Sequence, residues 1–148
     1  MENVYVFISP KYEKLNQALC SQIVNKVLTH FDFKSFDVNL IFTSDTYVSN
    51  LKKEFFSKNQ WTDVIAFPMH SKNDKSVEGE IYISMPTAKD NAKIYKQSYG
   101  KELARLVIHG SLHLLGIDDD TVEEKEQMTK LEEYFLNETS WKELIEKK

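Results

Sequence analysis

The stretch SYGKELARLVIHGSLHLLGIDDD, residues 98–120, can be read as one long helix that ends at a glycine and is followed by an acidic turn. At 100° per residue its apolar side chains cover most of the helix circumference, which is typical of a helix buried in a core. The remaining polar stripe carries Glu102, Arg105, His109 and His113. This pattern predicts a central buried helix with one narrow polar face.

The polar stripe contains a candidate metal site. His109 and His113 are four residues apart, so their imidazoles lie on one helical face and can reach a single ion. Gly116 lets the chain leave the helix in a left-handed conformation, and Asp119 follows early enough to fold back towards the histidines. Two imidazoles and one carboxylate are ligand types that zinc accepts, with a fourth position left for water.

Asp119 has a second interpretation, because it belongs to an acidic run before the next predicted helix. Residues 118–121 read DDDT, and Thr121 with Glu124 forms a capping-box pattern. Asp120 or Thr121 can cap that helix alone, which would free Asp119 for the metal.

The pattern overlaps the zinc-protease helix HExxH but differs at the catalytic position. Where those proteases carry a glutamate that activates water, this chain has Gly110. Glycine cannot accept a proton, so the sequence disfavours peptide hydrolysis by that route.

Residues 109–119, HGSLHLLGIDD, resemble the signature HGxLHLxGYDH of the YbeY family. Asp119 stands where the family usually has a third histidine, an exchange that keeps a ligand type but adds a negative charge. The resemblance continues in residues 61–68, WTDVIAFP, and residues 79–81, GEI. It also includes five positions at the expected intervals, namely Glu102, Leu103, Met128, Leu131 and Glu132. Phe56 stands where many members carry an arginine implicated in activity.

The resemblance implies a zinc-dependent, single-strand-specific endoribonuclease with one ion per chain. It also implies a role in 3′-end maturation of the small-subunit 16S rRNA and in ribosome quality control, in the cytoplasm. The implied partners are rRNA, components of the small ribosomal subunit and a small GTPase. The residue spacing by itself indicates only a hydrolytic metal site formed by His109, His113 and Asp119.

Two further residues are candidates for catalysis. Arg105, the only arginine, lies one turn before His109 and could hold a substrate phosphate, or it could form an ion pair with Glu102. Glu80 could act as a base or support a metal ligand, because the matching family position is acidic, or it could be a charge at a strand edge. Asp63, preceded by Thr62, is expected to set the turn into the following strand.

Composition indicates one ordinary globular domain spanning residues 1–148, with 41% hydrophobic and 28% charged residues. A single cysteine, Cys20, excludes an internal disulfide and favours a reducing compartment. We expect no secretory signal and no membrane span. The net charge of −4 argues against nucleic acid, but residues 117–148 carry −6 and residues 1–116 carry +2, so the acidity belongs to the C-terminal part.

The hydrophobic patterns predict a single α/β domain. Its mixed four-stranded sheet is mostly parallel with one antiparallel strand, and helices pack on it, including a metal helix like that of zincins. The first two connections are long enough for parallel β-α-β units, whereas the short third one predicts an antiparallel pair. The expected strands are residues 4–8, 38–42, 64–67 and 80–84, and the expected helices are residues 11–30, 45–56, 85–95, 98–115 and 121–136.

Three functions are compatible with the sequence. The first is a metal-dependent endoribonuclease. The second is a metal hydrolase of another substrate, which Gly110 disfavours for peptides. The third is a non-catalytic ribosome-assembly factor whose metal only fixes the helix turn, an alternative that Phe56 and the acidic charge keep open.

Overall fold

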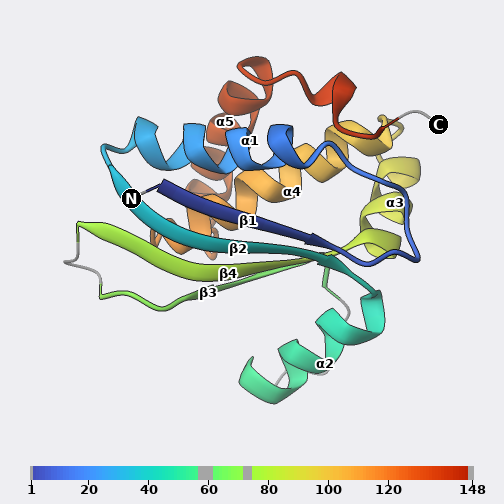
Figure 1. Ribbon diagram of the computed structural model, residues 1–148, viewed down its shortest axis with the longest axis horizontal. Helices are drawn as coiled ribbons and strands as arrows, with labels where there is room; N and C mark the ends of the chain where they lie inside the picture. The colour runs from blue at the N-terminus through green and yellow to red at the C-terminus, as the bar shows by residue number, and fades with distance from the viewer. Residues whose placement is uncertain (1, 57–61, 72–74, 147–148) are drawn as a thin grey trace.

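The computed structural model describes residues 2–56, 62–71 and 75–146 and contains one four-stranded sheet in the order β1-β2-β4-β3 (Figure 1). The pairs β1–β2 and β2–β4 are parallel, and β3 is antiparallel to β4. The predicted mixed α/β sheet with one antiparallel strand is therefore confirmed. The strands are β1 (Glu2–Ile8), β2 (Ser35–Thr43), β3 (Val64–Pro68) and β4 (Ser76–Ser84).

The prediction of a parallel β-α-β unit through the second connection, from β2 to β3, is wrong. Helix α2 (Asp45–Phe56) leads from β2 to β3, but β3 lies at the sheet edge and β4 takes the position beside β2. A physical reason is that Pro68 has no backbone N–H to donate and is tolerated at an edge. Strand β4 is longer than predicted and has buried side chains at Val77, Ile81 and Ile83, which suits a central position.

The helices follow the predicted pattern with one shortened start. Helix α1 begins at Gln17 rather than at residue 11, because Asn16 caps it by accepting a hydrogen bond from the Leu19 N–H at 3.0 Å. The preceding Leu15 forms a bridge to Ile145 near the C-terminus. Besides α2, the helices are α1 (Gln17–His30), α3 (Met85–Ile94), α4 (Tyr99–Leu114) and α5 (Val122–Asn137), and a 3-10 turn covers Trp141–Glu143.

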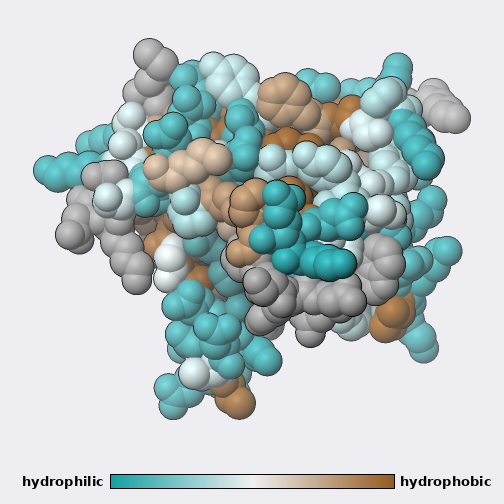
Figure 2. Space-filling view, turned by 90° about the horizontal axis from the view of Figure 1, so that it is seen from below, coloured by the Kyte–Doolittle hydropathy of each residue, from teal (hydrophilic) through white to brown (hydrophobic). Residues whose placement is uncertain are grey.

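Helix α4 lies at the centre of the molecule. Helices α1, α4 and α5 lie on one side of the sheet and α2 on the other (Figure 1). Helix α4 contacts α1, α3 and α5 as well as strands β3 and β4. Its apolar side chains are almost completely buried between these elements, among them Leu103, Leu106, Val107, Ile108 and Leu112. The side of the molecule shown in Figure 2 is mostly hydrophilic, and within the described residues no helix is long and apolar enough to cross a membrane.

Two glycines allow α4 to approach the hairpin of β3 and β4 closely. A Cβ atom on Gly110 would lie 2.6 Å from Cγ2 of Ile81 and 3.2 Å from Cγ2 of Val64. A Cβ atom on Gly79 would lie 2.8 Å from Cδ2 of Leu114. Position 110 therefore faces the sheet and has no room for the glutamate that zinc proteases carry there.

The substitution Gly110→Ala tests this close packing. In an exposed helix the change normally stabilises by about 1 kcal/mol, because alanine is the better helix former. Here we expect a loss of roughly 1–3 kcal/mol in the free energy of unfolding, since the added methyl group overpacks the contact with Ile81. Urea denaturation measures the sign directly, and a stabilised variant would contradict the packing described.

Candidate metal centre

The end of α4 is shaped by Gly116, which has a φ of 83°. The Gly116 N–H donates to the carbonyl of His113 at 3.0 Å, and the Ile117 N–H donates to the carbonyl of Leu112 at 3.2 Å. This pair of bonds is a Schellman motif, which ends a helix and reverses the chain. The reversal brings Asp119 back to the polar stripe of α4.

The next helix is capped without Asp119. Thr121 Oγ1 accepts a hydrogen bond from the Glu124 N–H at 3.1 Å, and a Glu124 carboxylate oxygen accepts one from the Thr121 N–H at 3.0 Å. The predicted capping box is thus confirmed. It leaves the Asp119 carboxylate available, and its oxygens lie 3.4 Å from Nε2 of His109 and 3.5 Å from Nε2 of His113.

These three side chains form a compact, half-buried group that can hold a metal ion. The two Nε2 atoms of His109 and His113 are 3.0 Å apart. Four ligands about 2.0–2.1 Å from a zinc ion in a tetrahedron are about 3.3–3.4 Å from one another, so the observed separations of 3.0–3.5 Å fit one such ion. The side chains keep 17–30% of their surface exposed, which leaves an open side for water or substrate.

The protonation of the two imidazoles also suits a cation. Nδ1 of His109 lies 2.6 Å from a carboxylate oxygen of Glu132, so Nδ1 carries the hydrogen, and in the neutral ring Nε2 then presents a lone pair to the centre. Burial and then the neighbouring His109 lower the pKa of His113, against the opposing charge of Asp119, so this ring is neutral at pH 7. Lone pairs and a carboxylate that face one another favour a positive ion between them.

Arg105 forms the ion pair that was one of its two predicted roles. Its Nε and Nη2 atoms donate to the two carboxylate oxygens of Glu102 at 2.8 and 2.7 Å. Its Nη1 donates to Glu132 at 3.3 Å, and Asp63 lies 3.8 Å from Nη2. Burial alone would lower the pKa of Arg105, but these carboxylates raise it on balance, so the guanidinium stays charged and its donors point into the protein.

The structure does not bring Glu80 to the three candidate ligands. Successive side chains of a strand point to opposite faces, and Ile81 faces α4, so Glu80 lies on the other face of the sheet. There it accepts hydrogen bonds from Tyr82 at 3.0 Å and Asn39 at 3.4 Å. Burial, helped by the Glu80 carboxylate, raises the pKa of Tyr82 to about 12.

Glu132 is the residue at this site to which residue patterns alone assigned no role. It lies on α5 with 6% of its surface exposed, on the buried face that includes Met128 and Phe135. A single carboxylate within an otherwise apolar face is the signal that could have identified it, since buried acids need partners. The side chain of Phe56, where the family arginine was expected, lies outside the described residues, as does Trp61.

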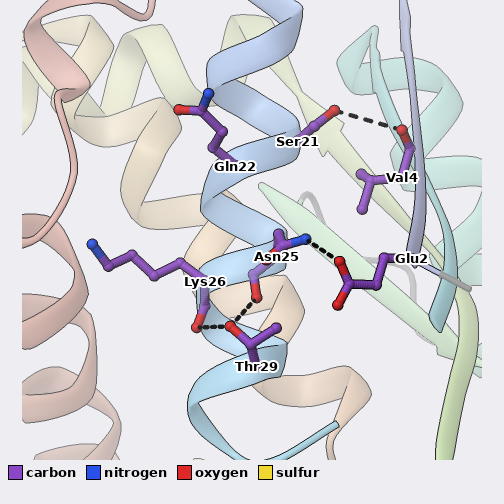
Figure 3. A pocket seen from close by; sticks show the side chains of 7 residues that line it. All are labelled: Glu2, Val4, Ser21, Gln22, Asn25, Lys26 and Thr29. Carbon is purple, nitrogen blue, oxygen red and sulfur yellow. Dashed lines mark hydrogen bonds between the residues drawn. The ribbon is translucent and has the colours of Figure 1, made fainter. Parts of the chain in front are cut away.

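A separate hollow of about 370 Å³ lies between β1 and α1 (Figure 3). Strand β1 is the edge strand opposite to β3 in the sheet. In the hollow, Asn25 donates to Glu2 at 3.5 Å, and Ser21 donates to the Val4 carbonyl at 3.5 Å. Its lining consists of polar side chains together with Val4, and none of the candidate ligands lines it.

Known proteins resemble this chain over most of its length. The profile of the family described as Endoribonuclease YbeY matches residues 7–140. The endoribonuclease YbeY of Amoebophilus asiaticus is 34% identical over 90% of this chain and 91% of its own, and that of Cytophaga hutchinsonii is 32% identical over 86% and 88%. The endoribonuclease YbeY of Karelsulcia muelleri is 38% identical over 68% and 70%.

The fold agrees with these sequence relationships. The solution structure of TM1509 from Thermotoga maritima superposes with a TM-score of 0.60 at 26% identity, covering 92% of this chain and 91% of the other. The family profile spans the helix with the two histidines, the glycine turn and the strands that support them. The resemblance seen in the sequence is confirmed, and the chain belongs to the endoribonuclease YbeY family.

Proposed function

We propose that this chain is a metal-dependent endoribonuclease in which His109, His113 and Asp119 hold one zinc ion. The observation that carries the proposal is the convergence of their ligand atoms within 3.0–3.5 Å on the half-exposed face of α4. Two nitrogen ligands favour zinc over magnesium or calcium, which prefer oxygen ligands. Membership of the family supplies the reaction class, hydrolysis of RNA.

The chain's own residues prepare a hydrolytic site in three ways. A zinc ion held there would supply a water of lowered pKa and positive charge near the phosphoryl oxygens. His113 presents a neutral imidazole, the Nε2 atoms of both histidines lie at the centre, and Asp119 adds the negative charge that retains a cation. Gly110 packs against the sheet and offers no protein base, which favours a phosphodiester over a peptide as substrate.

We further propose single-stranded rRNA as the substrate, with action on the 3′ end of 16S rRNA and in ribosome quality control in the cytoplasm. Components of the small ribosomal subunit and a small GTPase are the proposed partners. Family membership supports this assignment, and no residue of the site specifies it. The competing function is an assembly factor without nuclease activity, which the acidic residues 117–148 favour because they repel RNA.

Removing one ligand should weaken metal binding while an equal loss of charge nearby should not. We expect Asp119→Ala to reduce the affinity for Zn²⁺ by more than about 100-fold. Loss of a residue that only hydrogen-bonds to a metal ligand costs less than this. Asp118→Ala removes the same charge from an exposed neighbour and should change the affinity less than about threefold. Competition with a chromogenic chelator measures both, and equal effects would remove Asp119 from the ligand set.

An RNA cleavage assay distinguishes the proposed nuclease function from the alternative function as an assembly factor. The zinc-loaded protein should cut a single-stranded RNA and leave a stable RNA duplex intact. His109→Ala should reduce the cleavage rate by at least about 100-fold, because the variant loses a ligand of the ion that would activate the attacking water. Gel analysis of end-labelled RNA provides the measurement. A zinc-loaded wild type that does not cut would favour the assembly factor, and cutting unchanged by His109→Ala would place the activity elsewhere.

A further inference from the structure

Glu132 links the candidate metal centre to the only arginine of the chain. One of its carboxylate oxygens lies 2.6 Å from Nδ1 of His109, and the other accepts a hydrogen bond from Nη1 of Arg105 at 3.3 Å. Each oxygen therefore has its own partner. The residue comes from α5, whereas both partners come from α4, so the contact joins two helices at the site.

Arg105 is itself held by a fully buried carboxylate. Glu102 has no exposed surface, and both of its oxygens accept hydrogen bonds from the guanidinium, at 2.8 and 2.7 Å. Gln97 donates to the same carboxylate at 2.8 Å and Asn91 at 3.3 Å. A buried ion pair contributes a fixed geometry when all its hydrogen-bonding positions are filled, and Glu102 meets this condition.

The same arrangement reaches the start of β3. Asn91 also donates to the carboxylate of Asp63 at 2.9 Å, and that carboxylate lies 3.8 Å from Nη2 of Arg105. Side chains from α3, α4, α5 and the residue just before β3 thus meet around one guanidinium. We call Asp63, Asn91, Glu102, Arg105 and Glu132 the arginine cluster.

We propose that Glu132 and Arg105 are positioning residues for the metal centre. Glu132 holds the hydrogen of His109 on Nδ1 so that the Nε2 lone pair faces the ion, and Arg105 holds Glu132. The proposal rests on the proposed function only in that His109 is a metal ligand. It assigns Arg105 to the support of a ligand rather than to the binding of a substrate phosphate.

A neutral imidazole exists as two tautomers, with the hydrogen on either Nδ1 or Nε2. A carboxylate at Nδ1 can only accept, so it selects the tautomer with the hydrogen on Nδ1. With the hydrogen on Nε2 instead, an N–H would point at the place of the ion and His109 could not bind it. Outer partners of this kind are worth about 10–100-fold in metal affinity.

Glu132→Gln should reverse this selection. The guanidinium of Arg105 donates hydrogen bonds only, so it attracts the amide oxygen of the new side chain. The amide NH₂ group then faces Nδ1 of His109, which must become the acceptor, and the hydrogen moves to Nε2. The shape of the side chain is kept, whereas its donor and acceptor pattern is inverted.

The experiment compares Glu132→Gln with Glu133→Gln in the full chain. Glu133 is the exposed neighbour on the same helix, so its replacement removes the same charge without touching His109. The first readout is the dissociation constant for Zn²⁺, measured by chelator competition. The second is the ¹⁵N NMR spectrum of the imidazoles in the zinc-free proteins at about pH 8, above the ordinary histidine pKa of about 6.5, which distinguishes the two tautomers.

We expect Glu132→Gln to weaken zinc binding by about 10–100-fold and to shift the His109 hydrogen from Nδ1 to Nε2. Glu133→Gln should change neither quantity. Arg105→Lys, which keeps the charge but loses the two-pronged bond to Glu102, should weaken zinc binding in the wild-type background. In the Glu132→Gln background it should have little further effect, because the residues act in series.

Two results would overturn the proposal. The first is a His109 hydrogen on Nδ1 in both glutamine variants, and the second is equal zinc affinity in both. A purely structural role predicts lower stability to urea without either change. If the wild type binds no zinc, the proposed function fails. The tautomer of the zinc-free protein then still shows whether Glu132 orients His109, so the two failures are distinguishable.

Discussion

The close contact between α4 and the hairpin of β3 and β4 is the constraint on which the rest of the structure depends. Gly110 and Gly79 remove the side chains that would hold the helix away from the sheet. Since α1, α3 and α5 also contact α4, only one stripe of the helix remains for polar groups. The histidines, the arginine and its partners must share that stripe, which explains why the candidate ligands and the arginine cluster are neighbours.

The electrostatic balance of this stripe favours a bound cation. Three carboxylates, those of Asp63, Glu102 and Glu132, surround the guanidinium of Arg105. A fourth, that of Asp119, faces the two imidazoles, which contribute no charge when neutral. Carboxylates in a partly desolvated site repel one another unless positive charge is added. A divalent ion between His109, His113 and Asp119 would supply that charge beside the carboxylate of Asp119. The charged groups along the polar stripe therefore influence one another, and the candidate metal ligands are partly exposed to solvent.

Much of this arrangement could be predicted from the sequence, because it follows from local spacing. The apolar period of α4, the four-residue interval of the histidines, the glycine turn and the capping box at Thr121 all act within one or two helical turns. Long-range facts could not be predicted in the same way. The insertion of β4 between β2 and β3 depends on strand order, which spacing does not determine. The contact of Glu132 with His109 depends on how α5 docks, and docking is decided by packing across the whole core.

The central claim is that two imidazoles and one carboxylate bind a single ion on the polar face of α4. X-ray absorption spectroscopy at the zinc edge of the loaded protein tests it most directly. The account predicts a four-coordinate ion with about two imidazole ligands and nitrogen or oxygen neighbours at about 2.0–2.1 Å. A spectrum without imidazole scattering, or one that is unchanged when both His109 and His113 are replaced, would contradict it.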